Sequence, residues 1–499
     1  MTYYQKIPQM NNRIIFIILL TAAHCSSLWS QGVADALRFS SYDFGSTARA
    51  VGSGSALGAL GADFSVLSTN PAGLGWYRKS EFVLSTGIAN SSTQALLTND
   101  QAARFSEETR SVFNIPSFGV VVASQPSNLN WATFNFGIGL NRIANFNRAL
   151  YFNGSSEGSI TDRFLELANS NFGLDDFESG LAFDAEAIYD FNNDNIYNSD
   201  FELSPGALVR KNQNVLTKGS INELVFSFAG NYKERVLIGA TLGVPFVSFS
   251  QNKTYAESDE GDGPDGAIPF FEDLEYSEEL TSTGIGVNFK FGLILRLHQM
   301  LRIGAAVHSP TSYSLEDNYF SSMVYNYTDS GESFTGSATS PDGIFEYKLQ
   351  TPWRYIGNVG LVFGKAGFLS GEVEWVDYGK AKFNFDDFAS DAREANDEIV
   401  NQLSTAVNIR LGGEFAYDIF RFRGGLGILA SPYANDNTLT NSYSAGFGIR
   451  ERSFFIDLAY RHRSLSETYI PYLTSEAPQQ FVDADTDNNQ LLLTLGFKF

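Results

Sequence analysis

Three basic residues occupy stretches in which polar and apolar side chains alternate: Lys290, Arg410 and Arg461. A period of two places each of them on the polar face of a predicted strand. Ammonium and guanidinium groups bind carboxylates through charge-assisted hydrogen bonds. We therefore predict that one or two of these residues bind a ligand carboxylate.

The alternative for these basic residues is a set of ion pairs within the protein, because charges held away from water need partners. The same polar faces carry acidic residues and further basic ones: Glu372, Glu374, Glu414, Asp457, Arg296, Arg421, Arg423 and Arg463. Most of these charges should pair with one another.

No residue pattern typical of an enzyme is present. The four histidines, at positions 24, 298, 308 and 462, form no H-E-x-x-H motif, and we find no nucleophile–base pair or phosphate-binding loop. The single cysteine, Cys25, excludes a disulfide framework and a Cys-rich zinc site. We expect no catalytic residue, no metal and no cofactor.

Two acidic runs have the spacing found at the start of calcium-binding loops. Asp190–Asp194 and Asp483–Asp487 carry side-chain oxygens at alternate positions. Neither run has the later glycine and glutamate that complete such a loop. Solvated acidic loops are therefore the favoured interpretation, and calcium binding is the alternative.

Composition narrows the class of protein. The 499 residues include 45 Gly and 43 Phe, only 18% are charged, the net charge is −22, and the mean hydropathy is −0.13. The acidity excludes a basic nucleic-acid binder. Only residues 14–23 form a sustained apolar run, and a spanning helix needs about 20 residues. An outer-membrane β-barrel fits, because its apolar outward faces alternate with polar inward faces.

The body of the chain alternates like membrane strands. In the last ten residues Leu491, Leu493, Leu495, Phe497 and Phe499 share one face. Many such segments exceed the ~5–6 residues typical of a soluble sandwich, which is the alternative fold. We predict an all-β fold, a transmembrane antiparallel β-barrel of about 14 strands within residues 81–499. The strands are expected at 81–97, 110–124, 131–153, 221–233, 236–256, 278–298, 301–327, 345–364, 368–386, 405–418, 419–433, 441–453, 454–473 and 490–499.

The predicted connections alternate between short and long, as short periplasmic turns and long extracellular loops do in such barrels. The longest predicted extracellular loop spans residues 154–220. Residues 155–203 contain twelve Asp or Glu and one Arg, and residues 257–279 contain ten Asp or Glu and no Lys or Arg. The acidity is thus concentrated in the predicted loops.

The chain before the barrel has two parts. Lys6 and Arg13 precede the apolar run, which predicts a signal peptide over residues 1–30. Residues 31–80 are rich in small residues, and Asn70–Gly73 predicts a turn in which Pro71 fixes φ and Gly73 permits a positive φ. This segment is either a plug inside the barrel or a periplasmic tail.

Several motifs together resemble the FadL/TodX family of outer-membrane transporters for long-chain fatty acids and other hydrophobic compounds. The segment from Ala62 through Asn70-Pro71-Ala72-Gly73 resembles the family's plug. Ile303–Pro310 and Ile428–Pro432 resemble its Gly-x-x-x-x-Ser-Pro strand ends, and Ile238–Pro245 is a looser copy. Thr351-Pro352-Trp353, followed by Leu369–Tyr378, resembles a strand pair of that family. The resemblance covers nearly the whole mature chain, except the long loop at 154–220.

The resemblance implies a monomeric outer-membrane barrel that takes up hydrophobic small molecules, with fatty acids as the first class. It implies an apolar pocket gated by a plug, which Asn70, Pro71, Ala72 and Gly73 would shape, and a possible lateral exit to membrane lipid. Pro245, inside a predicted strand, is the candidate kink of such a wall opening, although a proline also simply marks a strand end.

Two other functions are compatible with the same fold. The barrel could be a protein-interaction scaffold, like the PorV-type component of a secretion system, with a protein partner at the extracellular loops. It could also be a surface adhesin. Uptake predicts an apolar pocket between plug and wall, whereas a scaffold predicts a lumen filled by charged pairs.

Overall fold

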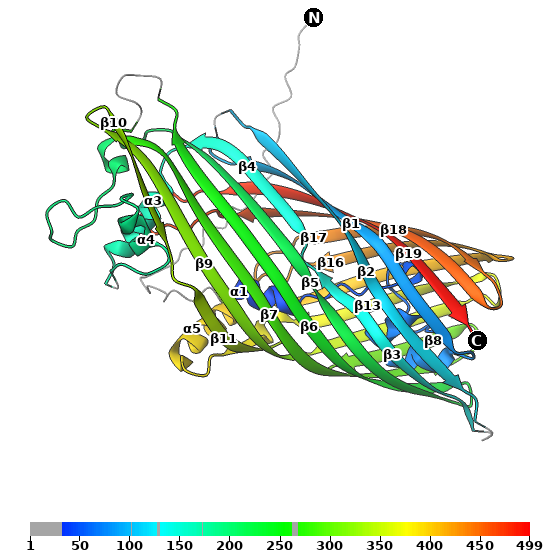
Figure 1. The fold of residues 1–499 in the computed structure, drawn as a ribbon. Helices are drawn as coiled ribbons and strands as arrows, with labels where there is room; N and C mark the ends of the chain where they lie inside the picture. Colours follow the sequence, from blue (N-terminus) through cyan, green and yellow to red (C-terminus); the bar gives the residue numbers. More distant parts are fainter. Residues whose placement is uncertain (1–31, 101, 127–129, 172, 262–267) are drawn as a thin grey trace, which may run out of the picture.

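The computed structural model describes residues 32–100, 102–126, 130–171, 173–261 and 268–499. The expected signal peptide lies outside these ranges. Figure 1 shows a long barrel of tilted strands, with short helices at one end and the dark blue N-terminal part of the chain inside it. We call the end with the helices the loop end and the opposite end the turn end.

The wall is a single antiparallel sheet of nineteen strand segments within the described residues. They are β1 (Glu81–Leu97), β2 (Phe105–Ser124), β3 (Trp131–Asn145), β4 (Arg148–Ser156), β5 (Val209–Tyr232), β6 (Val236–Asp259), β7 (Phe271–Arg296), β8 (Leu301–His308), β9 (Ser312–Asp329), β10 (Glu332–Thr339), β11 (Gly343–Gln350), β12 (Arg354–Val362), β13 (Gly367–Asp377), β14 (Lys382–Asn384), β15 (Thr405–Tyr417), β16 (Phe420–Ala430), β17 (Leu439–Arg450), β18 (Phe454–Tyr469) and β19 (Val482–Lys498).

These segments make fourteen wall strands, as predicted. β3 with β4, β8 with β9, β10 with β11 and β12, and β13 with β14 each form one interrupted wall strand. β1 pairs with β2 on one side and with β19 on the other, from Glu81↔Lys498 to Leu97↔Val482. The barrel is therefore closed and has no free edge.

Wall pairing is interrupted at three prolines. β6 runs on through Pro245, but its register with β7 omits Val244 and Pro245. β8 and β9 are separated at Pro310, and β11 and β12 at Pro352. Proline has no N–H for the ladder, so pairing breaks around it. The predicted kink at Pro245 coincides with such a break, and a wall opening there stays a prediction.

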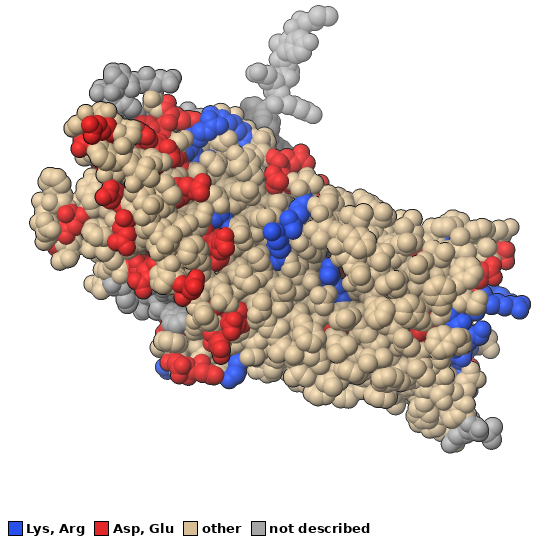
Figure 2. Space-filling model, in the orientation of Figure 1, with Lys and Arg blue, Asp and Glu red and all other residues tan. Residues whose placement is uncertain are grey.

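Side chains alternate between the two faces of the wall. In β7, Val287, Phe289 and Phe291 are exposed, whereas Asn288 and Lys290 between them are buried. On the face shown in Figure 2, the surface is largely uncharged along the middle of the barrel, and acidic residues gather at the loop end. This is the surface of a membrane barrel, with an apolar band between two polar ends.

Several strands extend farther than predicted. β4 ends at Ser156 and β5 begins at Val209, so the connection predicted as 154–220 spans 157–208. β19 begins at Val482, so the run Asp483–Asp487 lies in a strand and not in a loop. Its carboxylates accept hydrogen bonds from Ser464, Ser466 and Thr468 of β18. Alternation missed these ends because the pattern inverts there: the outward face is polar, and Val209 and Val482 face inward into an apolar cluster.

In the other acidic run, at residues 190–194, a side chain accepts hydrogen bonds from nearby backbone N–H groups. The carboxylate of Asp190 accepts hydrogen bonds from the N–H groups of Asp194 and Asn195, at 3.1 and 2.9 Å. In the described ranges no group of three or more His, Cys, Asp or Glu is placed to hold a metal ion. Calcium binding at residues 190–194 therefore has no further support.

The helices are short. In the N-terminal part they are α1 (Val33–Ser40), α2 (Ala48–Gly52) and the 3-10 helices η1 (Phe64–Leu67) and η2 (Pro71–Trp76); elsewhere they are α3 (Ile160–Ala168), α4 (Ser179–Asp184), η3 (Asp200–Leu203), η4 (Tyr378–Lys380) and α5 (Ala389–Gln402). Of the helices in the described part of the chain, none is long and apolar enough to cross a membrane.

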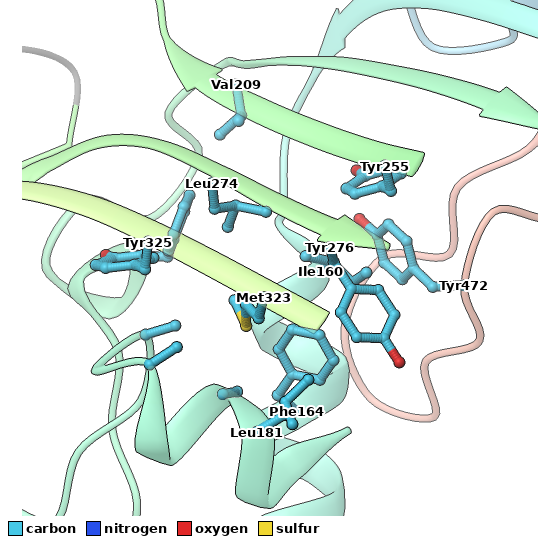
Figure 3. Close-up of a cluster of buried hydrophobic side chains, with 14 of the residues drawn as sticks. Ile160, Phe164, Leu181, Val209, Tyr255, Leu274, Tyr276, Met323, Tyr325 and Tyr472 are labelled. Carbon is cyan, nitrogen blue, oxygen red and sulfur yellow. The ribbon is translucent and has the colours of Figure 1, made fainter. Parts of the chain in front are cut away.

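Residues 157–171 and 173–208 fold over the loop end, and we call them the cover. Phe164 of α3, Leu181 of α4 and Phe201 of η3 are buried in one apolar cluster with β7 and β9 (Figure 3). The cluster also contains Tyr276 and Met323 of those strands. The cover is thus a packed element and not a solvated loop.

One acidic residue of the cover is buried in this region. The carboxylate of Asp200 accepts hydrogen bonds from the hydroxyls of Tyr325 and Tyr189, at 2.7 and 3.3 Å. Burial raises the pKa of Asp200 above its ordinary value of 3.8 and raises the pKa of Tyr189 to about 12. The folded cover therefore binds a proton at Asp200 more readily than the unfolded chain does.

This shift predicts a pH dependence of the cover. Its stability should fall as pH rises from 3.8 through the raised pKa, because the folded state then loses the proton that it binds preferentially. The substitution Asp200→Asn keeps an acceptor and removes the charge, so it should stabilise the cover at neutral pH and weaken this dependence, to which the raised pKa of Asp162 in α3 also contributes. Hydrogen exchange of residues 160–203 at pH 4 and pH 7 measures the effect.

The control is Asp184→Asn, at an exposed position of α4. It should follow the wild-type pH profile. Indistinguishable profiles for wild type and the Asp200 variant would show that Asp200 does not cause the pH dependence of the cover.

Candidate functional site in the barrel lumen

The chain from Val33 to Trp76, which we call the N-terminal segment, lies inside the barrel (Figure 1). Most of its residues are buried, and its contacts are with the inward faces of strands around the wall. It is rich in Gly, Ala and Ser, which suits a lumen where backbone and wall must approach closely.

Three pairs of inward-facing glycines on neighbouring strands receive this segment. Gly119 and Gly139 pair across β2 and β3, Gly239 and Gly292 across β6 and β7, and Gly412 and Gly425 across β15 and β16. The ring of Phe64 lies over the first pair, Pro71 and Ala72 over the second, and Ser53 and Gly54 over the third. Added Cβ atoms at these glycines would collide with the segment.

The predicted motif at residues 70–73 sits on the second pair. Asn70 caps η2: its Oδ1 accepts from the N–H of Ala72 at 3.2 Å, while its Nδ2 donates to the carbonyl of Gly58 at 2.9 Å. Pro71 takes the first helical position, where a missing N–H costs nothing.

The predicted turn at this motif is wrong in one respect. Residues 71–76 form a 3-10 helix, and Gly73 does not have a positive φ. Gly61, which lies against it, has φ +66°. A Cβ at Gly73 would come within 2.9 Å of the Cα of Gly61. Gly73 is needed for this close approach between two parts of the segment, which local sequence does not reveal.

Arg410, a predicted carboxylate-binding residue, belongs to a buried ionic network next to Asn70. Its guanidinium contacts Glu372 at 3.0 Å and Glu374 at 2.7 Å. Glu372 also accepts from the Nδ2 of Asn358 at 2.7 Å, and the side-chain oxygen of Asn358 accepts from Asn70 at 3.2 Å. The network thus connects wall strands to the N-terminal segment.

Lys290 is likewise paired. Its ammonium binds the carboxylate of Glu223, which also accepts from the hydroxyl of Ser68 at 2.8 Å. Close by, the Nε2 of His308 donates to the carbonyl of Thr69 at 2.6 Å. All these side chains are buried, so each charge needs its partner.

Arg461 pairs with the N-terminal segment itself. Its guanidinium binds both carboxylate oxygens of Asp43, one of them at 2.7 Å. Arg463 faces inward on the same strand and, among the described residues, makes no ion pair within 4.0 Å. Two guanidinium groups therefore face one carboxylate here, and the side chain of Asp43 keeps 33% of its exposure.

All three predicted ligand-binding cations thus have a carboxylate partner, as the ion-pair alternative expects. Their role in binding a ligand stays a prediction, and it requires the ligand carboxylate to replace a protein carboxylate. Arg461 is the most accessible of the three for such an exchange, because Lys290 and Arg410 are almost fully buried.

Sequence reasoning missed Asp43, Glu223 and Asn358. Glu223 and Asn358 occupy inward positions that alternation could have identified. Asp43 lies in a segment without a periodic pattern and binds a residue 418 positions away. No local signal predicts that pair.

Removing the Asn70 side chain should loosen the N-terminal segment. Asn70→Ala leaves the carbonyl of Gly58 and the N–H of Ala72 without their partner, at a cost of ~1–3 kcal/mol. Faster hydrogen exchange of residues 58–76 in the solubilised full-length protein is the expected result. Asn90→Ala, which removes an exposed hydrogen bond to Ser111, is the control. Unchanged protection in the Asn70 variant would rule out this role.

A side chain added at one of the inward-facing glycines should also displace the N-terminal segment. A side chain at Gly292 would meet Asn70 and lie within 3.0 Å of Pro71, so Gly292→Val should displace η2 at ~1–3 kcal/mol. Gly357→Val is the matched control, because no atom lies within 4 Å of a Cβ there. Protease sensitivity near residues 58–76 should rise for Gly292→Val alone. An equal rise for both variants would contradict the contact of Gly292 with the N-terminal segment.

No protein-family model matches the chain, and no curated protein sequence matches it. Among solved structures, a Pseudomonas aeruginosa FadL homologue matches with a TM-score of 0.53 and 13% sequence identity, over 91% of this chain and 98% of that chain. The P. putida toluene transporter TodX matches with a TM-score of 0.54 and 11% identity, also over 91% and 98%. The predicted likeness in fold is confirmed: the chain has the β-barrel fold of these FadL and TodX structures.

Proposed function

We propose that the chain is an outer-membrane channel for the passive uptake of hydrophobic small molecules, with long-chain fatty acids as the leading class. The N-terminal segment is its plug. The fold shared with a FadL homologue and a toluene transporter supports the general class. The short connections face the periplasm and the cover faces outward, as in other barrels of this kind.

One observation carries the proposal. The lumen is occupied by a segment that is held by hydrogen bonds, ion pairs and glycine contacts, all of which can be exchanged without breaking a covalent bond. Passage then requires the segment to rearrange. Loops and segments that gate a site are drawn from such locally reversible elements.

The Asp43–Arg461 pair suggests where an anionic headgroup would act. Arg461 and Arg463 offer two guanidinium groups to one carboxylate, and that carboxylate belongs to the plug. A fatty-acid carboxylate bound there replaces Asp43 and removes one tie between plug and wall. Ligand binding and plug release are then coupled.

A second candidate function rests on the cover. Phe191, Ile196 and Leu203 are exposed on it, with Phe191 at 80% exposure, amid acidic residues. Exposed apolar residues with a polar rim are typical of protein-interaction surfaces. The lumen also contains the buried charged pairs that a scaffold predicts, such as Arg410 with Glu372 and Arg423 with Asp457. A scaffold role with a protein partner, of the PorV type, is therefore the alternative.

Uptake of two labelled ligands distinguishes the channel function from the scaffold function. Cells that lack their own fatty-acid channel and express the full chain should take up oleate and methyl oleate faster than cells with the empty vector. Arg461→Gln removes both the headgroup contact and the tie to Asp43, so it should lower the ratio of oleate uptake to methyl oleate uptake roughly tenfold, since a charge-assisted hydrogen bond contributes ~1.5–3 kcal/mol. Arg78→Gln, which removes an exposed ion pair at the turn end, should change neither.

The outcomes contradict different parts of the proposal. If cells that express the chain take up both ligands no faster than cells with the empty vector, the chain is not a channel for these compounds. Equal losses for oleate and its methyl ester in the Arg461 variant remove the carboxylate site and leave the channel.

A further inference from the structure

A hollow of about 710 Å³ lies in the wall where β13, β15 and β16 adjoin. It is a shallow depression that is widely open to its surroundings. Outward-facing apolar side chains form its rim, all of them exposed: Leu369, Leu411, Phe415 and Phe422. The hollow therefore opens on the membrane side of the barrel.

A further pair of glycines, which faces outward, forms the floor of the hollow. Gly413 and Gly424 pair across β15 and β16 and are outward neighbours of the inward pair Gly412 and Gly425. No atom lies within 4 Å of a Cβ placed on Gly424. On the inner side, Gly54 lies against Gly425. The floor is thus bare backbone that the N-terminal segment closes from within.

The hollow lies in the half of the membrane next to the turn end. Gly413 is five residues from Asp418, in the turn that joins β15 to β16. At ~3.3 Å per residue and a strand tilt of ~40°, this places it ~13 Å above the turn. The apolar band of such barrels is ~25 Å tall, so the hollow faces lipid chains of the turn-side leaflet.

A free cation lies at the turn end below the hollow. Lys365 is exposed in the turn between β12 and β13 and, within the described ranges, forms no ion pair within 4.0 Å. Gly367, two residues further on, pairs with Phe415 at the rim. The adjacent turn contributes the acidic side chain of Asp418, whereas Arg421 of β16 lies on the inward face, 3.9 Å from Glu414.

We propose that the hollow binds one acyl chain of a phospholipid of the turn-side leaflet, whose phosphate is held by Lys365. In a membrane, lipid and protein surfaces are equally apolar, so close packing and polar contacts decide which molecule stays bound. The bare glycine floor supplies the close packing. Lys365 supplies a charge-assisted contact to phosphate. This site does not depend on transport.

Native mass spectrometry tests the site. The full-length barrel is reconstituted in vesicles of phosphatidylethanolamine and phosphatidylglycerol, extracted in mild detergent, and its retained phospholipid is measured. Gly424→Leu fills the hollow and should lower retention of one phospholipid about tenfold, which corresponds to ~1.4 kcal/mol. Gly357→Leu, at another open outward position of β12, should retain lipid like the wild type.

A second variant tests the headgroup contact without touching the hollow. Lys365→Gln should lower the retained phospholipid and leave the fold unchanged, as judged by circular dichroism. Equal retention by wild type and both variants overturns the proposal. A wild-type dimer that Gly424→Leu dissociates, with no change in retained lipid, also overturns it and assigns the hollow to contact between barrels.

Discussion

The absence of side chains at paired inward positions is the constraint on which the rest of the structure depends. Glycines face each other across β2 and β3, β6 and β7, and β15 and β16, and at each place a part of the N-terminal segment lies directly on the wall. A β-carbon at any of these positions would push the segment toward the axis. Close backbone approach therefore determines how a chain of over forty residues can share the lumen with the wall.

Charge neutralisation is the second requirement, because the segment excludes water from the groups around it. Lys290 binds Glu223, Arg410 binds Glu372 and Glu374, and Arg423 binds Asp457 at 2.7 Å. Removing one member of such a pair leaves an uncompensated buried charge. The segment takes part through Asp43, Ser68 and Asn70, so its position and the ionic state of the wall depend on each other.

Much of the wall could be predicted from sequence, because each strand faces lipid on one side and the lumen on the other. The two environments differ enough to mark nearly every strand by alternation, as in β7 with Phe289 outward and Lys290 inward. At the outer ends of β5 and β19 the pattern inverts, with polar residues outward and Val209 and Val482 inward, and the predicted bounds were wrong.

The lumen could be predicted only in outline. The polar faces identified Arg410 together with its partners Glu372 and Glu374, and they identified Arg461 but not its partner Asp43, because that pairing joins residues far apart in the chain. Asp43 and Arg461 illustrate this, and so does the contact of Gly61 with Gly73, which replaces a predicted turn. Complementarity between distant surfaces carries no local pattern.

Single-channel conductance in planar bilayers tests the central claim, that the N-terminal segment closes the barrel. The full chain should show no steady ion conductance, whereas a variant that lacks residues 33–76 and keeps its strand content by circular dichroism should form a stable open pore. Equal conductance of the two proteins would contradict the account.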